Sequence, residues 1–191
     1  GVLTNRAGTL TLSGTSTYSG NTAVSAGTLL VSGSIGSSAG VAVSGGATLA
    51  GAGTVGAVTM ASGATISPGN TAGVAGTLTV NGAATLVGTN VCDVTGTGAT
   101  DCDKIAASGA VTASSTLTIN LPTSAPAGFD EASAYTWTIM SGSSANAANM
   151  AIGTKWTTSG TLAVSASGNT IVVTHTPSAP AAPTGLSASD G

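Results

Sequence analysis

The stretch from Gly8 to Val31, GTLTLSGTSTYSGNTAVSAGTLLV, begins and ends on nearly the same short segment. GTLTL occupies residues 8–12 and GTLLV occupies residues 27–31. Between them lie a turn rich in Ser, Gly and Thr, a short extended run at 22–25 and a second turn. We interpret this stretch as one repeat unit, and much of the remaining chain as variations on it.

The Gly-x-Leu core of the unit returns along the chain. Leu10, Leu29 and Leu49 recur at spacings of 19 and 20 residues, and Ile66 follows after 17. Related segments lie at 8–12, 27–31, 46–50, 63–67, 76–80, 82–86, 114–119, 160–164 and 168–173. These segments are short, alternate small or polar with apolar residues, and are rich in Thr, Val, Ile and Leu, which indicates strands.

A repeat of about 20 residues cannot bury its apolar face alone, but it can if each unit forms one coil of a stack. Equivalent strands then pair in parallel about 4.8 Å apart. We expect one interior row of Leu10, Leu29, Leu49 and Ile66, and a second row of Val24, Val43 and Met60. Outward positions hold Thr9, Thr11, Thr28, Thr48, Thr65, Thr77 and Thr79. The expected fold class is all-β, a parallel β-helix or β-solenoid, with an antiparallel sandwich as the rival.

The composition agrees with a thin core. Charged residues make up 5% of the chain and aromatic residues 3%, against a usual charged fraction of about 25%. A Gly/Ser/Thr bias is also typical of flexible linkers, but the regular return of Leu, Val and Ile argues against that alternative. The net charge is -3, and the basic residues are Arg6, Lys104 and Lys155, so the basic surface needed for nucleic acid is missing.

The chain has no apolar run of the roughly 18 residues needed to span a membrane. It does not begin with Met and shows no signal peptide, so we expect it to be a segment of something longer.

The repeat unit resembles the autotransporter-associated β-strand repeat found in passenger domains of bacterial surface proteins. The residues that carry the resemblance are GTLTLSGTSTYSG (8–20), NTAVSAGTLLVSGSIG (21–36), GGATLAGAGTVGAVTMASGATISPGNTAG (45–73) and GTLTVNGAATL (76–86). The resemblance is close over about residues 8–90 and looser at DKIAASGAV (103–111) and STLTINL (115–121). It implies a right-handed parallel β-helix that holds material away from the cell surface, and it brings no catalytic residue with it.

The repeat fails first at residues 88–104, GTNVCDVTGTGATDCDK. Two nearby cysteines in a chain poor in Lys predict a disulfide between Cys92 and Cys102, and with it an oxidising, extracellular setting. Such a crosslink would clamp the base of a loop and stabilise the fold by up to about 3 kcal/mol. Two free thiols are the alternative.

Three carboxylates, Asp93, Asp101 and Asp103, are expected at the same clamp. Clusters of oxygen ligands can bind Ca²⁺, but this spacing matches no known calcium loop. We favour solvated loop acids.

Most aromatic residues lie between 122 and 156. They are Phe129, Tyr135, Trp137 and Trp156. We expect them to form a capping region that closes the open core near the C-terminal end of the solenoid. The alternative is a platform on which Trp137 or Trp156 stacks against a glycan. Residues 143–151 are interpreted as a loop, and His175 as a surface residue of a last strand pair at 161–176.

We predict two regions. Residues 1–176 form the β-solenoid, with a divergent capping part from 91 onward. Residues 177–191 form an extended Pro-rich linker and resemble, through APTGLSASDG, the opening of a fibronectin type III-like module.

The acids of the chain are Asp93, Asp101, Asp103, Asp130, Glu131 and Asp190. None lies in the repeat strands of residues 1–90, so we expect no enzyme and no cofactor. A stalk or filament-forming segment of a secreted bacterial cell-surface protein fits best. It would link other modules and stack on itself or on adjacent domains.

Two other functions remain open. One is an adhesin that binds glycans or host proteins through loops leaving the solenoid. The other is ice binding through Thr-x-Thr pairs such as Thr9 and Thr11. This is less favoured, because the intervening coils read GTLLV, GATLA and GATIS.

Overall fold

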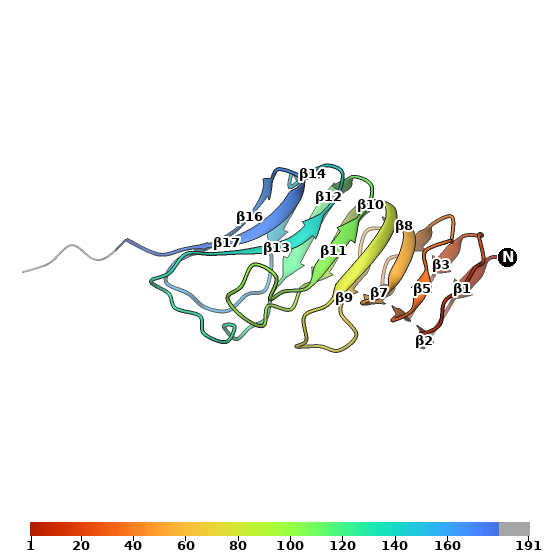
Figure 1. Cartoon of the computed structure of the whole chain (residues 1–191), viewed down its shortest axis with the longest axis horizontal. Helices are drawn as coiled ribbons and strands as arrows, with labels where there is room; N and C mark the ends of the chain where they lie inside the picture. The colour runs from red at the N-terminus through yellow and green to blue at the C-terminus, as the bar shows by residue number, and fades with distance from the viewer. Residues whose placement is uncertain (180–191) are drawn as a thin grey trace, which may run out of the picture.

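The computed structural model describes residues 1–179, which form an elongated stack of β-coils (Figure 1). The predicted fibronectin-like opening lies outside the described residues, as does most of the Pro-rich linker. The strands of the described part are β1 (Leu3–Asn5), β2 (Thr9–Leu12), β3 (Thr22–Val24), β4 (Thr28–Val31), β5 (Ser34–Ile35), β6 (Val41–Val43), β7 (Thr48–Gly51), β8 (Thr54–Met60), β9 (Thr65–Pro68), β10 (Thr77–Val91), β11 (Lys104–Ala107), β12 (Val111–Asn120), β13 (Tyr135–Ser141), β14 (Ala145–Asn146), β15 (Met150–Ile152), β16 (Thr161–Ser167) and β17 (Thr170–Thr176).

Parallel pairing arranges these strands in three sheets around one axis. The first sheet contains β1, β3, β6, β14 and parts of β8, β10 and β12. The second contains β2, β4, β7, β9, β15 and the ends of β10 and β12. The third contains β5, β11, β13 and the beginnings of β8 and β10. This arrangement confirms the predicted parallel β-helix and excludes the antiparallel sandwich.

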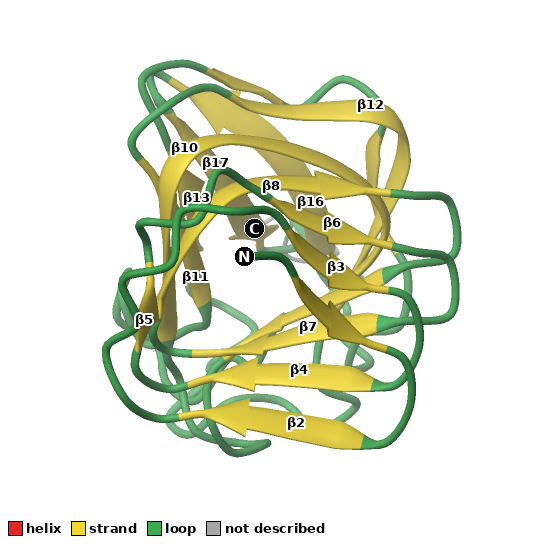
Figure 2. Cartoon of the chain, turned by 90° about the vertical axis from the view of Figure 1, so that its right-hand side faces the viewer, coloured by secondary structure: helices red, strands yellow, loops and turns green. Residues whose placement is uncertain are grey.

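The coils turn clockwise as they recede from the N-terminal end. Viewed from that end, the strands of the first sheet run to the right at the top, and β2, β4 and β7 run to the left at the bottom (Figure 2). A clockwise turn that moves away from the viewer is a right-handed helix, as the family resemblance implies.

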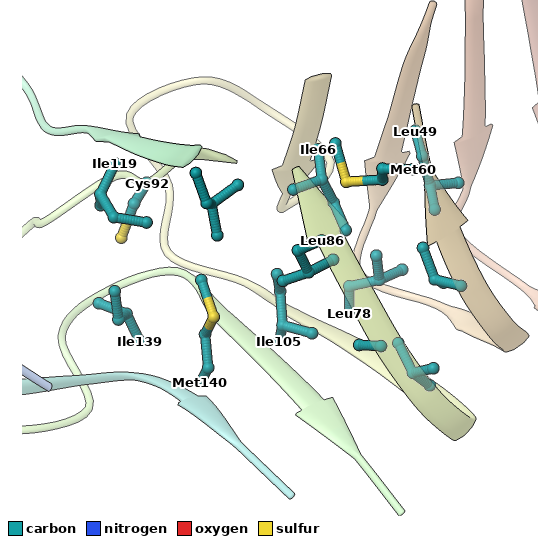
Figure 3. Packing of buried hydrophobic residues seen from close by; sticks show 14 of the residues in the cluster. Leu49, Met60, Ile66, Leu78, Leu86, Cys92, Ile105, Ile119, Ile139 and Met140 are labelled. Atoms are coloured by element: carbon teal, nitrogen blue, oxygen red, sulfur yellow. The ribbon is translucent and has the colours of Figure 1, made fainter. Parts of the chain in front are cut away.

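The predicted interior rows are present. Leu10 pairs with Leu29, Leu29 with Leu49, and Leu49 with Ile66. The second row, Val24, Val43 and Met60, is likewise in register. These side chains belong to one continuous apolar core that extends along the stack (Figure 3).

One row holds a residue that its pattern does not predict. Asn90 follows Ile66 and precedes Ile119, and it is 1% exposed. Its Oδ1 atom has no hydrogen-bond partner among residues 1–179. The apolar row therefore contains one buried amide.

Long strands turn the corners between sheets. β10 bends at Gly82 and Gly88, whose φ angles are 137° and 92°. A Cβ atom on Gly82 would lie 2.8 Å from the Cβ of Ala57, and one on Gly88 would lie 2.3 Å from the carbonyl oxygen of Ala64. Both positions require glycine, because the backbone is left-handed and the adjacent coil is close.

Threonine forms one continuous outward row on the second sheet. Pairing places Thr9, Thr28, Thr48, Thr65, Thr89 and Thr118 in successive register. The neighbouring outward row does not repeat, because it reads Thr11, Leu30 and Ala50 in the first coils. Ice binding through Thr-x-Thr pairs needs two adjacent rows of threonine, and the second row is not maintained.

The C-terminal end departs from the parallel pattern. β17 pairs antiparallel with both β13 and β16, so a hairpin covers this end of the stack (Figure 1). Residues 143–151, which we expected to be a loop, contain the short strand β14 and the first two residues of β15, and both strands pair with β12. No helix within residues 1–179 is long and apolar enough to cross a membrane.

Candidate functional site

Three long loops leave the solenoid at the same corner of successive coils. They are residues 69–76, 92–103 and 121–134, and each connects the second sheet to the third. In earlier coils the same corner needs only residues 32–33 or 52–53. Figure 1 shows the three loops projecting from the lower side of the stack. We call them together the loop edge.

The cysteines of the loop edge are free thiols, so the predicted disulfide is wrong. The Sγ atom of Cys92 lies 3.6 Å from the carbonyl oxygen of Asp103, and Cys92 belongs to the apolar core (Figure 3). The Sγ atom of Cys102 lies 3.4 Å from the carbonyl oxygen of Thr138 on β13. Each thiol is therefore directed to a different backbone acceptor.

Backbone hydrogen bonds close the base of this loop instead. Asp103 N–H donates to Asp93 O (2.8 Å), and Thr95 N–H donates to Asp101 O (2.8 Å). Val94 and Cys102 form an antiparallel bridge between these two bonds. These backbone hydrogen bonds, rather than the predicted disulfide, hold the two ends of loop 92–103 together.

Asp103 is buried, contrary to the expectation of solvated acids, and is 1% exposed. Its Oδ1 atom accepts a hydrogen bond from Gly76 N–H (2.7 Å), and its Oδ2 atom accepts one from Asp93 N–H (3.1 Å). Burial raises the pKa of Asp103 to about 7, although the two amide donors oppose this shift. The burial of Asp103 could not be predicted from the sequence, because an Asp in a loop rich in Gly and Thr is usually solvated.

The other carboxylates of the loop edge also accept hydrogen bonds from nearby loop residues. Asp93 accepts one from Gly73 N–H (2.6 Å), and Asp101 accepts one from Gly98 N–H (2.8 Å). Two acids of loop 121–134 behave similarly: Asp130 accepts from Ala132 N–H and Ser133 Oγ–H, and Glu131 accepts from Ser159 N–H and Oγ–H. These carboxylates therefore stabilise the conformations of the loops through hydrogen bonds.

Burial also raises the pKa of both thiols. The pKa of Cys102 rises to about 12, with nearby Asp103 adding to the effect of burial. The pKa of Cys92 lies well above its usual value, first because of burial and then because of Cys102 and Asp103. Within residues 1–179, no group of three or more His, Cys, Asp or Glu side chains is arranged to hold a metal ion.

The aromatic residues form the predicted cap. The Trp137 and Trp156 rings meet edge to face with centroids 5.8 Å apart, and Phe129 packs against Trp156 at 5.5 Å. The Nε1 atom of Trp137 donates to the carbonyl oxygen of Gly96 (2.9 Å), which ties β13 to loop 92–103. The cluster thus closes the core and anchors the loop edge.

The two tryptophans do not form a glycan platform in this structure. Trp137 is 0% exposed and Trp156 is 1% exposed, so neither presents a ring face to solvent. Aromatic stacking with a sugar needs such a face. Both rings are buried in the hydrophobic contacts of the cap and are inaccessible to a sugar.

His175 is buried rather than on the surface. Its Nδ1 atom lies 2.9 Å from the carbonyl oxygen of Ser133, and its Nε2 atom lies 3.0 Å from Thr158 Oγ1. Phe129 packs on the imidazole with centroids 4.8 Å apart. The histidine therefore links the two loop segments that contain Ser133 and Thr158. Its place in an alternating strand pattern does not indicate this role.

The N-terminal end, in contrast, is open. β1 pairs only with β3, and β2 pairs only with β4, among the described strands. A pocket of about 260 Å³ lies there, lined by Gly1, Val2, Leu3, Leu12, Ser16 and Tyr18. Val2 is 72% exposed. Figure 2 looks onto this end of the stack.

Comparison with known families agrees with this picture. Residues 7–31 match the passenger-associated-transport-repeat. The matched residues contain β2, β3 and β4, so they form the step from the first coil to the second. No curated protein is a significant match to the chain. The chain therefore carries a repeat of autotransporter passenger segments, within a parallel β structure.

Proposed function

We propose that this chain is a structural segment of a secreted bacterial cell-surface protein, a stalk in which β-coils stack end on end. One observation carries the proposal: the N-terminal coil is open, while the C-terminal end is closed by a hairpin and an aromatic cap. The passenger-type repeat at residues 7–31 supports a surface location. The hydrogen-bonded state of the loop acids favours a structural role over catalysis.

The open end offers both backbone and apolar groups to a further coil. Thr28 N–H donates to Gly8 O (2.8 Å), and Ser32 N–H donates to Leu12 O (3.0 Å). Because alternate residues of a strand point their backbone groups to opposite sides, Thr9 and Thr11 direct theirs away from β4. A further coil of the same repeat would pair with those groups and cover the pocket at Val2 and Leu3.

The test extends the stack by one unit. A copy of residues 1–19 placed before Gly1 puts a second leucine over Leu10, since Leu10 and Leu29 are themselves 19 residues apart. We expect the added coil to raise the free energy of unfolding, measured by chemical denaturation, because stacked repeats gain a nearest-neighbour interface. The control is the same insertion with serine at its three leucines, which should give no gain.

A second pair of variants locates the contact. In the extended chain, substituting the original Thr11→Pro removes the amide that faces the added coil and spares the pairing with β4. Thr11→Val retains that amide. The proposal requires that Thr11→Pro abolish the gain and that Thr11→Val preserve it. An equal gain in both variants, or none in either, would count against coil-on-coil docking.

An adhesin that binds through the loop edge is the second candidate, because the three loops project from one corner of successive coils. Loop 69–76 can be shortened cleanly, since a Cβ on Gly76 would lie only 2.6 Å from the Cα of Gly69. Deleting residues 70–75 joins these glycines. An adhesin should bind an immobilised glycan or host protein, and the deletion variant should bind it more weakly; retained binding would exclude this loop as the contact.

A further inference from the structure

One buried carboxylate holds two loops of the loop edge together. Asp103 accepts the amide of Gly76 at the end of loop 69–76 and the amide of Asp93 at the start of loop 92–103. A Cβ on Gly69 would lie 3.1 Å from Asp103 Oδ1, so the carboxylate fits against the neck of the first loop. Opening that loop is therefore the direct way to bring water to Asp103.

The surroundings of Asp103 are poor for a negative charge. Both of its hydrogen-bond donors are backbone amides, and no cationic side chain is hydrogen-bonded to it in residues 1–179. Asp93 is a nearby like charge. The other titratable groups close to the site are Cys92, Cys102 and Asp101 on the same loop and Lys104 on β11. Loop 69–76, GNTAGVAG, contributes no titratable side chain.

The loop covers part of the second sheet. A pocket of about 190 Å³ lies between them, with Leu30, Ala50, Ser67 and Val91 on the sheet side. Asn70 Oδ1 accepts Ala52 N–H (3.0 Å) and Asp93 Oδ2 accepts Gly73 N–H (2.6 Å) on the loop side. Movement of the loop would change the access to this outward row of side chains.

We propose that loop 69–76 is a pH-responsive lid, which stays closed while Asp103 is protonated and is released as Asp103 ionises. An ionised carboxylate gains hydration when the loop opens, whereas a neutral carboxylic acid gains little. Linkage fixes the direction: the closed state binds the proton more tightly than the open state, so raising the pH favours opening. The lid thereby makes the Leu30 to Val91 row more accessible in alkaline than in acidic surroundings.

The pKa of Asp103, about 7, sets the upper end of the pH range over which the lid responds. Between the ordinary carboxyl pKa of about 4 and that value, the closed form is protonated and the open form is ionised, so the opening equilibrium constant should rise about tenfold per pH unit. Above about 7 and below about 4, the carboxyl has the same protonation state in both forms, so opening should be independent of pH.

Amide hydrogen exchange measured by NMR between pH 5 and 9 tests the lid. After correction for the intrinsic base catalysis of exchange, the protection of Gly73 and Gly76 should fall about tenfold per pH unit between pH 5 and 7 and be constant above 7. Asp103→Asn, which is neutral at every pH, should keep the protection constant. Asp101→Asn is the matched control and should behave like the wild type, because Asp101 accepts only within its own loop.

Three results would overturn the proposal: constant protection in the wild type, a pH dependence that survives in Asp103→Asn, or one that disappears in Asp101→Asn. If Asp103→Asn does not fold, the carboxyl carbon of Asp103 is titrated in the wild type. A midpoint near 7 supports the lid, and a midpoint near the ordinary value of about 4 rules it out.

Discussion

At the scale of single residues, the core is defined by rows of like side chains, and Asn90 breaks one of them. The first members of that row, from Leu10 to Ile66, could be predicted because they recur with the repeat. Asn90 and Ile119 could not, because loop insertions and long bent strands change the spacing after Pro68. Burial of Asp103 and His175 was missed for a related reason: both are enclosed by loops whose course the repeat does not determine.

The unpaired amide makes Asn90 a weak point. We expect Asn90→Leu to raise the free energy of unfolding by about 1–2 kcal/mol, because it replaces an unsatisfied buried polar group with an apolar side chain of similar size. Urea denaturation measures the change. Asn90→Ala is the control for the size of the side chain and should gain less, and a loss of stability in Asn90→Leu would show that the amide has a bonding partner.

The two cysteines should be inert in the folded protein. Both are buried, and burial raises the pKa of each thiol, so little thiolate exists at pH 8. We expect an aromatic disulfide reagent to label neither cysteine in the native state and both in guanidinium chloride. If the intact mass instead increases by two hydrogens on reduction, the two cysteines are joined by a disulfide.

Asp103 should make the whole fold pH-dependent. Its pKa is about 7 in the folded chain and 3.8 as an ordinary carboxyl, so the folded state binds the proton more tightly. The resulting stability is fully present below the unfolded value and is lost as the pH rises through 7. We expect unfolding free energy to fall by roughly 1–3 kcal/mol between pH 5 and pH 8.5, and to change much less in Asp103→Asn.

At the scale of elements, the short strands of the first coils follow from the sequence, whereas their assembly into longer strands does not. β8 and β10 each continue from the third sheet into the first, and β10 thereby joins the segments 76–80 and 82–86, which the repeat pattern gives as two. β14 and β15 exist because β12 offers them an edge, so their pattern alone is too short to predict them. The presence of an aromatic cap could be predicted from the sequence, but the hydrogen bond from Trp137 to Gly96 could not.

The cap offers a matched pair of substitutions. Trp137 Nε1 donates to Gly96 O, whereas Trp156 Nε1 is buried without a partner in the described chain. Replacing either with Phe removes similar apolar volume. We expect Trp137→Phe to be the more destabilising by about 1 kcal/mol in thermal or chemical denaturation, since only that change removes a hydrogen bond and leaves an acceptor unsatisfied. Equal losses would mean that the bond to loop 92–103 contributes nothing.

At the scale of the whole molecule, the two ends differ, and so should their stability. A stack in which each coil contacts only its neighbours loses its ends first, and within residues 1–179 the N-terminal coil has a neighbour on one side only. We expect amide exchange, measured by mass spectrometry, to be fastest in residues 1–20 and slowest around β10 and β12. Covering the open end with one more coil should slow the exchange of residues 1–20 and leave the C-terminal hairpin unchanged.

The shared corner of the three loops has a consequence for their lengths. Neighbouring coils are about 4.8 Å apart, whereas a packed layer of polypeptide is about 10 Å thick. Long loops on adjacent coils are therefore too crowded to project side by side independently, and each must lean on the next. Two contacts show how the loops support one another. Asp103 accepts hydrogen bonds from two loops, and Trp137 donates one to Gly96. Insertions at this corner should therefore change size as a group, because lengthening one loop displaces its neighbours.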